Sequence, residues 1–256
     1  MNILIIGDVV GKVGRRAMAS LLPEIRRRHE LDLVIANGEN AAGGKGLTPN
    51  TADEMFEAGV EIITSGNHIW HYREIYSYLD GEAPLLRPLN YPEGAPGRGV
   101  ITRDGVGVIN LIGRTFMPGT LNCPFGAADE ALAELGDVPI IIVDMHAEAT
   151  SEKAALAWYL DGRVSAVIGS HTHIPTADTR LLPKGTAFVS DVGMVGPRDS
   201  ILGMETHPVI EAFLSQLPTR FPSEEHGPVV FNSVLVQIDE GSGRATSIQR
   251  VDSEVA

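Results

Sequence analysis

Several apolar stretches of this sequence each end in residues that can bind a metal ion, and this pattern constrains the fold most strongly. The clearest case is Val167-Ile168-Gly169-Ser170-His171-Thr172-His173, where β-forming residues give way to two histidines one residue apart. A strand that ends there delivers both imidazoles to one loop. Histidine is the commonest metal ligand, but a His-x-His pair also occurs in ordinary loops. Its meaning therefore depends on the other stretches.

Four further apolar stretches lead into oxygen or imidazole side chains in the same way. Residues Ile3 to Ile6 are apolar at every position, as expected for a central strand buried on both faces, and Gly7 and Asp8 follow directly. The polar residues that follow the four stretches are Asp8, Glu39-Asn40, Asn67-His68 and His146. The first three stretches alternate with helical patterns, which predicts an α/β sheet whose site lies at the carboxyl ends of its strands.

The remaining pattern predicts a single domain over residues 1–256, because no linker or charge block divides the chain. A helix is expected from Lys12, with a kink at Pro23. The pair Asp104-Gly105 between two apolar runs predicts a hairpin. Further strands are expected at residues 31–36, 61–64, 99–103, 106–112, 138–144, 165–168, 186–190, 229–238 and 245–251.

Charge and cysteine content exclude several classes of protein. The 33 acidic and 20 basic residues give a formal net charge of −13, which argues against binding to long nucleic acid or to an anionic membrane. Cys123 is the only cysteine, so neither an intramolecular disulfide nor a cluster of thiolate metal ligands is expected. The first residues lack the features of a signal peptide, and we expect a cytoplasmic location.

The glycine-rich segment 41–46 invites comparison with a phosphate-binding loop. It does not fit that pattern, because Gly44 stands where the loop requires lysine. The earlier glycines Gly7, Gly11 and Gly14 also lack the spacing of a dinucleotide-binding turn. Folds built around a nucleotide-binding loop are therefore excluded.

The residues at the strand ends offer oxygen and imidazole donors and no sulfur. This mixture suits Mn, Fe, Zn or a mixed pair better than a structural zinc site, which is usually rich in cysteine. The set is larger than one tetrahedral ion needs, and it suits two ions about 3.5–4 Å apart that share one carboxylate. For single residues other roles stay open: Asp8 as a helix cap, Asn40 and Asn67 as turn residues, and His146 as a buried core histidine.

The order of these residues resembles the calcineurin-like metallophosphoesterase superfamily. Blocks of the type G-D-x-x, G-N-H and G-H-x-H, with a further histidine before the last, have counterparts along nearly the whole chain. The counterparts are Gly7-Asp8-Val9-Val10, Gly38-Glu39-Asn40, Gly66-Asn67-His68-Ile69, His146 and Gly169-Ser170-His171-Thr172-His173.

Three positions depart from the superfamily pattern. Val10 stands in place of a histidine, Glu39 replaces the shared aspartate, and Ser170 is inserted before the final histidine pair. The same departures, together with segments 38–44 and 191–196, are similar to the bacterial YmdB family.

This resemblance implies a four-layer α/β/β/α sandwich in which two mixed sheets face each other between helices. It also implies two metal ions, Fe and/or Mn, with Zn as a further candidate. The ligands of one ion would be Asp8, Glu39, Asn40 and His173, and those of the other Glu39, Asn67, His146 and His171. Asn40 would replace the ligand lost at Val10, and His68 would act as general acid. Family members hydrolyse phosphodiesters, notably 2′,3′-cyclic nucleotides.

Charge counting gives a separate argument about the substrate. Only two of the proposed ligands are carboxylates, so two divalent ions leave a site of about +2 that attracts a singly charged phosphodiester. A hydroxide bridging the ions would attack phosphorus, and His68 would protonate the departing alkoxide. Two alternatives stay open: a phosphomonoesterase or nucleotidase, and a regulatory metal-binding protein that acts through a partner surface. A homo-oligomer contact through residues 84–98 or 113–125 is also left open.

Overall fold

The computed structural model describes residues 1–255, and within this range the strands form one sheet of eight strands and one of six. The first sheet contains β1 (Asn2–Val9), β2 (Leu33–Asn37), β3 (Ile62–Thr64), β10 (Met194–Pro197), β11 (Val229–Phe231), β12 (Ser233–Ile238), β13 (Ala245–Arg250) and β14 (Ser253–Val255). The second sheet contains β4 (Val100–Arg103), β5 (Val106–Ile112), β6 (Ile140–His146), β7 (Ala166–Ser170), β8 (Arg180–Leu181) and β9 (Ala187–Val189). The helices are α1 (Gly11–His29), α2 (Pro49–Glu57), α3 (Ile75–Leu79), α4 (Pro124–Leu135), α5 (Thr150–Leu160) and α6 (Thr206–Ser215).

The first sheet is built around β1. This strand pairs in parallel with β2 on one side, and β3 continues the sheet beyond β2. On its other side β1 pairs first with the antiparallel strand β12, over Asn2 to Ile6, and then with the parallel strand β10 at Asp8 and Val9. The second sheet has the order β4-β5-β6-β7-β9-β8, with parallel strands from β5 to β9 and an antiparallel strand at each edge.

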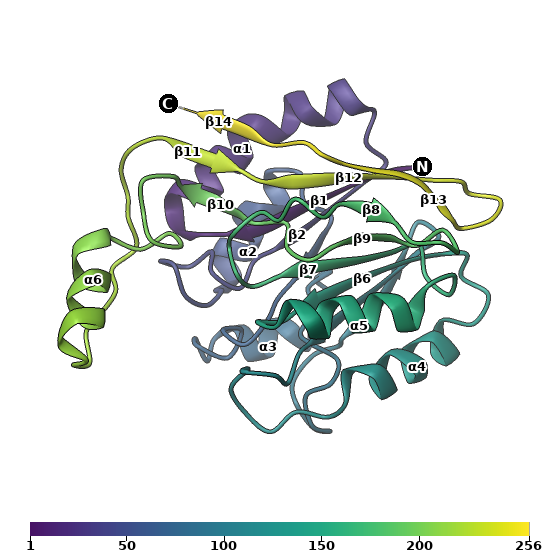
Figure 1. The fold of residues 1–256 in the computed structure, drawn as a ribbon, viewed down its shortest axis with the longest axis horizontal. Coiled ribbons are helices and arrows are strands. Elements are labelled where there is room, and N and C mark those ends of the chain that lie inside the picture. The colour runs from purple at the N-terminus through teal and green to yellow at the C-terminus, as the bar shows by residue number, and fades with distance from the viewer. Residues whose placement is uncertain (256) are drawn as a thin grey trace.

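Three apolar clusters separate four layers. Along β1, Leu4 and Ile6 point to one face of the sheet and pack with α1, α2 and α3, because side chains alternate along a strand. Ile3 and Ile5 point to the opposite face and pack with residues of the second sheet such as Ile142. The outer face of the second sheet packs against α4 and α5, and Figure 1 shows these two helices on the side away from the first sheet. The predicted α/β/β/α sandwich is therefore confirmed.

Most predicted elements are present, but the sequence prediction treats two strands as one and omits β8, β10 and β14. The stretch 229–238 is not one strand, because the chain changes partner at Asn232: β11 pairs with β10, and β12 pairs with β1. The strand β10 is not predicted because two of its four residues, Gly196 and Pro197, have weak strand preference. Its pairing with the end of β1 joins residues distant in sequence, which local periodicity does not reveal. The helix α1 continues through Pro23 to His29.

The two sheets bring the carboxyl ends of their parallel strands to one edge of the sandwich. The strands β1, β2 and β3 of the first sheet end there, as do β6 and β7 of the second. Loops that leave these strands therefore meet between the sheets, as the sequence predicts. None of the helices within residues 1–255 combines the length and apolar character needed to cross a membrane.

Candidate metal centre

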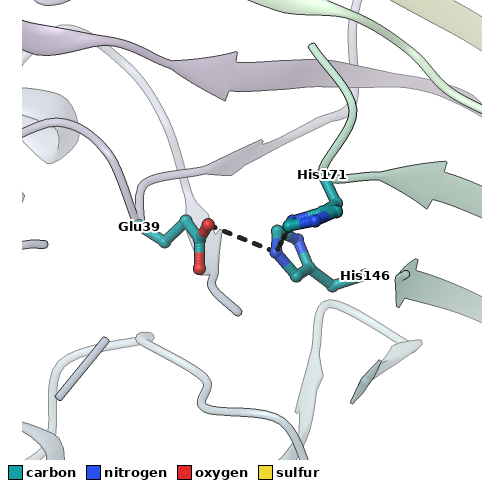
Figure 2. A group of neighbouring side chains, drawn as sticks. All are labelled: Glu39, His146 and His171. Atoms are coloured by element: carbon teal, nitrogen blue, oxygen red, sulfur yellow. Dashed lines mark hydrogen bonds and ion pairs between the residues drawn. The ribbon is translucent and has the colours of Figure 1, made fainter. Parts of the chain in front are cut away.

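Glu39, His146 and His171 bring one ligand atom each to a common point at this edge, with all three atoms within 4.8 Å of one another. Glu39 follows β2, His146 ends β6, and His171 follows β7. Figure 2 shows the carboxylate of Glu39 reaching from one side toward the two imidazole rings. Its Oε1 lies 3.2 Å from Nε2 of His146. The same Nε2 lies 3.0 Å from Nδ1 of His171 and 3.2 Å from Oδ1 of Asn67.

A second group of predicted residues lies on the other side of Glu39. The amide nitrogen of Asn40 lies 3.4 Å from Oε1 of Glu39 and 3.1 Å from Nε2 of His173. That imidazole nitrogen lies 3.8 Å from Oδ1 of Asp8. The structure thus brings all the predicted ligand residues together, in two groups that have Glu39 in common. This division matches the two ligand sets that the family resemblance implies, while the ligand roles themselves stay a prediction.

Two of the imidazole rings are held by hydrogen bonds through Nδ1. His146 Nδ1 lies 3.0 Å from the hydroxyl of Ser170, which in turn donates to Oδ1 of Asp144 at 2.7 Å. His173 Nδ1 donates to the carbonyl oxygen of Leu202 at 2.9 Å. With Nδ1 engaged in this way, Nε2 of each ring faces the other donors of the centre and is the nitrogen that could bind a metal ion. Sequence reasoning treated Ser170 only as an insertion and did not identify Asp144 or Leu202 as supports.

The charged groups of the centre are buried, and burial shifts their pKa values. Burial raises the pKa of Asp8 to about 6. Burial also opposes ionisation of Glu39, but the neighbouring imidazoles, His146 foremost, hold the pKa of Glu39 well below its ordinary value. Burial disfavours the charged form of His146, but the carboxylates, led by Glu39, outweigh it and raise the pKa of His146 to about 9. Burial, assisted by the charge of His146, lowers the pKa of His171 to about 3, so this ring is neutral at pH 7, as a ligand must be.

The site has the properties that a divalent cation requires. Oδ1 of Asp8 is fully buried and has no hydrogen-bond partner within residues 1–255, and a cation is the natural partner for such an oxygen. The donors are carboxylate and amide oxygens and imidazole nitrogens, which suit Fe, Mn and Zn. Gly66 leaves the space open: a Cβ atom there would collide with the ring of His146 and lie 2.5 Å from Oε2 of Glu39.

His68 lies at the border between this centre and the solvent. Its backbone N–H donates to Oε2 of Glu39 at 2.9 Å, and its Nδ1 lies 2.7 Å from Oδ1 of Asn40. With Nδ1 held by an amide oxygen, Nε2 is the ring nitrogen left for a substrate. The side chain is 28% exposed and lines a cavity of about 820 Å³. The predicted general acid is therefore in contact with both the ligand residues and open space.

A buried ion pair supports the loop that carries His171 and His173. Nζ of Lys153, on α5, lies 2.8 Å from Oδ2 of Asp191, and both side chains are almost fully buried. The same Oδ2 accepts the backbone N–H of Thr172 at 2.9 Å, between the two histidines. This bond fixes a strained loop, since His171 and His173 have φ angles of 100° and 65°, in the region that side chains other than glycine rarely adopt.

Replacement of Lys153 by methionine is expected to lower the free energy of unfolding by about 3–5 kcal/mol, because it leaves the Asp191 carboxylate buried without a counter-charge. Denaturant unfolding of the metal-free protein measures this change. The double variant Lys153→Met/Asp191→Asn is expected to be more stable than the single variant, because neither charge is then left unpaired. A single variant within about 0.5 kcal/mol of wild type, the usual range for surface substitutions, would show that the pair does not hold the loop.

Two facing mixed sheets between helices, with carboxylate, amide and imidazole side chains at the strand ends, define the metallophosphoesterase class of fold. The sequence profile of the family described as YmdB-like protein matches residues 4–251. The 2′,3′-cyclic-nucleotide 2′-phosphodiesterase of Bacillus subtilis strain 168 is 48% identical, over 98% of this chain and 96% of that protein. The chain therefore belongs to the YmdB-like family.

Two solved structures are similar over almost the whole chain. A hypothetical protein from Thermus thermophilus has a TM-score of 0.93 and 44% identity, with 100% of both chains covered. A structure described as a novel phosphatase from Mycoplasma pneumoniae has a TM-score of 0.93 and 32% identity, covering 99% of this chain and 93% of that one. The predicted family and fold are confirmed, and so is the prediction of an enzyme, since the curated Bacillus relative is one.

Proposed function

We propose that this chain is a metal-dependent phosphodiesterase that hydrolyses small phosphodiesters such as 2′,3′-cyclic nucleotides. The observation that carries the proposal is the pair of donor groups that share Glu39, with His68 beside them and open to a cavity. The name of the 48% identical Bacillus subtilis protein supports the same substrate class.

In this proposal the donor groups hold two ions, for which Fe and Mn are the leading candidates and Zn the next. The ligands of one ion are Asp8, Glu39, Asn40 and His173, and those of the other Glu39, Asn67, His146 and His171. The proposal is supported by the buried oxygen of Asp8 that lacks a hydrogen-bond partner within residues 1–255, and by the hydrogen bonds through Nδ1 that turn Nε2 of His146 and of His173 toward the other donors.

When bound, two such ions supply the positive charge that neutralises a phosphodiester and the acidity that turns water into a nucleophile. The chain contributes the remaining parts of the reaction. Only Asp8 and Glu39 among the ligands are carboxylates, so the protein does not cancel the cationic charge and the site suits a singly charged diester. His68 is positioned to deliver a proton from Nε2 to the departing alkoxide, because Asn40 holds its other ring nitrogen.

The products of 2′,3′-cyclic AMP test this proposal. The protein reconstituted with Mn²⁺ is expected to convert the cyclic nucleotide to 3′-AMP, since cleavage of the 2′ ester leaves the phosphate on the 3′ oxygen, and to do so no longer after chelation with EDTA. Liquid chromatography of the products measures both expectations. A phosphomonoesterase would instead leave the cyclic diester intact and release phosphate from 3′-AMP, whereas adenosine and phosphate formed from the cyclic nucleotide would show both activities in one protein. A metal-loaded protein that hydrolyses neither substrate would favour the regulatory alternative.

A further inference from the structure

A cavity of about 820 Å³ adjoins the metal centre, and its volume lies within the usual ~300–1,000 Å³ of ligand pockets. One wall comes from the loops that follow β2 and β3, with residues 43–45, His68, His71 and Tyr72. The opposite wall comes from residues 204–205 and 219–226, on either side of α6. Figure 1 shows α6 standing away from the two sheets. The cavity therefore lies where the chain, after α6, runs back past the metal centre.

The wall formed by residues 219–226 is tied to the body of the protein. The N–H of Glu205 donates to the carbonyl of Pro222 at 2.9 Å, and the hydroxyl of Ser223 donates to the carbonyl of Gly43 at 3.2 Å. Gly44 makes a close approach here, since a Cβ atom would lie 3.1 Å from that of Ser223. The Glu205–Pro222 bond joins the two parts of one wall, and the contacts of Ser223 join that wall to the other, so both walls are in place without a bound ligand.

Each wall presents an aromatic ring. Tyr72 is 37% exposed and Phe221 is 46% exposed, and both line the cavity. The ring of Tyr72 is fixed by close packing on Gly46, where a Cβ atom would lie 2.8 Å from Cδ2, and by an edge contact with His71 at 4.6 Å between ring centroids. Rings that are held in place but partly exposed suit the flat face of a nucleobase, because stacking needs little further ordering.

The charged residues that line the cavity are of both signs. Lys45 and Arg220 line it, and in the described part of the chain neither has a carboxylate partner within 4.0 Å. Glu205, Glu224 and Glu225 line it as well, and Oε1 of Glu224 accepts the N–H groups of the two residues that follow it, both at 3.0 Å. The cavity therefore has no excess of positive charge, and the aromatic rings are the feature that favours a nucleobase.

A smaller cavity of about 380 Å³ also adjoins His68, and it suits a base less well. Its aromatic lining residue is Trp70, whose ring already packs edge-on against Tyr76 at 5.5 Å and against Tyr91 at 5.2 Å. Trp70 thus has two aromatic neighbours, whereas within residues 1–255 Tyr72 has one, His71, and Phe221 has none.

We infer that the larger cavity binds the base of a nucleotide substrate, stacked between Tyr72 and Phe221, while its phosphodiester lies at His68 and the metal centre. This inference rests on the proposed function and names the part of the substrate that the enzyme selects. A phosphodiester without a base gains nothing from the two rings.

The test compares 2′,3′-cyclic AMP with the 2′,3′-cyclic phosphate of methyl riboside, which has the same sugar and diester but no base. In the Mn²⁺-loaded protein, Phe221→Leu and Tyr72→Leu are each expected to lower the ratio of kcat/KM for the nucleotide to that for the base-free diester by about tenfold, the effect of losing one stacked ring. Phe221→Tyr and Tyr72→Phe each keep an aromatic ring and are expected to have a ratio close to that of the wild-type protein. Phe213→Leu, on α6 outside the cavity and 75% exposed, is the matched control and should leave the ratio unchanged.

An unchanged ratio in both leucine variants, with wild-type protein active on both substrates, overturns the inference and leaves the phosphodiesterase assignment intact. Equal losses on the two substrates also overturn it, because the rings would then act through the structure of the site and not through the base. Wild-type protein that hydrolyses neither substrate would overturn the proposed function and the inference together.

Discussion

The Glu39→Gln variant is expected to lose more than about 100-fold in kcat/KM for 2′,3′-cyclic AMP, because even residues that only orient a metal ligand contribute about 10–100-fold to affinity or activity. Glu39 is the carboxylate that the two donor groups have in common. Glutamine preserves its size and can still accept the N–H of His68, but it removes the charge that both ions would share. A steady-state assay in the presence of excess Mn²⁺ measures the loss.

The matched control for this experiment is Glu54→Gln. Glu54 is a half-exposed carboxylate on α2 that pairs with Arg15 at 2.6 Å, outside the metal centre. The same chemical change there should leave activity within about twofold of wild type, since surface substitutions have small effects. Near wild-type activity in Glu39→Gln would show that no ion depends on this carboxylate.

The His68→Ala variant is expected to lose about 10²–10⁴-fold in kcat/KM for 2′,3′-cyclic AMP but much less for bis(p-nitrophenyl) phosphate. The departing group of the cyclic nucleotide is an alkoxide, which needs a proton, whereas nitrophenolate is stable without one. The ring is well placed for this role because Asn40 holds Nδ1 and the side chain lines the large cavity. Parallel assays with the two substrates measure the difference.

His207→Ala, on the exposed helix α6, provides a histidine control that lies outside the site. Equal losses on both substrates in His68→Ala would remove His68 from the role of general acid. Such a result would leave the ring a support for Asn40, whose Oδ1 lies 2.7 Å from Nδ1.

The arrangement of the candidate site could be predicted to a large extent because parallel strands end at the same edge of a sheet. The apolar stretch before Asp8 and the one before His171 are each recognisable as strands from composition alone. The central strands of both sheets run parallel, so the residues that follow them lie together at the carboxyl edge of the sandwich. The resemblance to a known family added the division into two groups, which the contacts of Glu39 reproduce.

The supports of the site could not be predicted in the same way. Lys153 and Asp191 are 38 residues apart and become partners only when α5 packs behind β7. The carbonyl of Leu202 that holds His173 carries no side-chain signal at all. The partner change at Asn232 depends on where β10 replaces β12 beside β1, which is a property of tertiary packing and not of local sequence.

The metal content of gently purified protein tests the central claim most directly. Elemental analysis of the wild-type chain is expected to find about two transition-metal ions per chain, Fe and/or Mn foremost, because the seven proposed ligands would suit two ions that share Glu39. The same analysis of Glu39→Gln should find less metal than in the wild-type protein. Wild-type protein that contains no metal, and takes up none from excess Mn²⁺, would contradict the account.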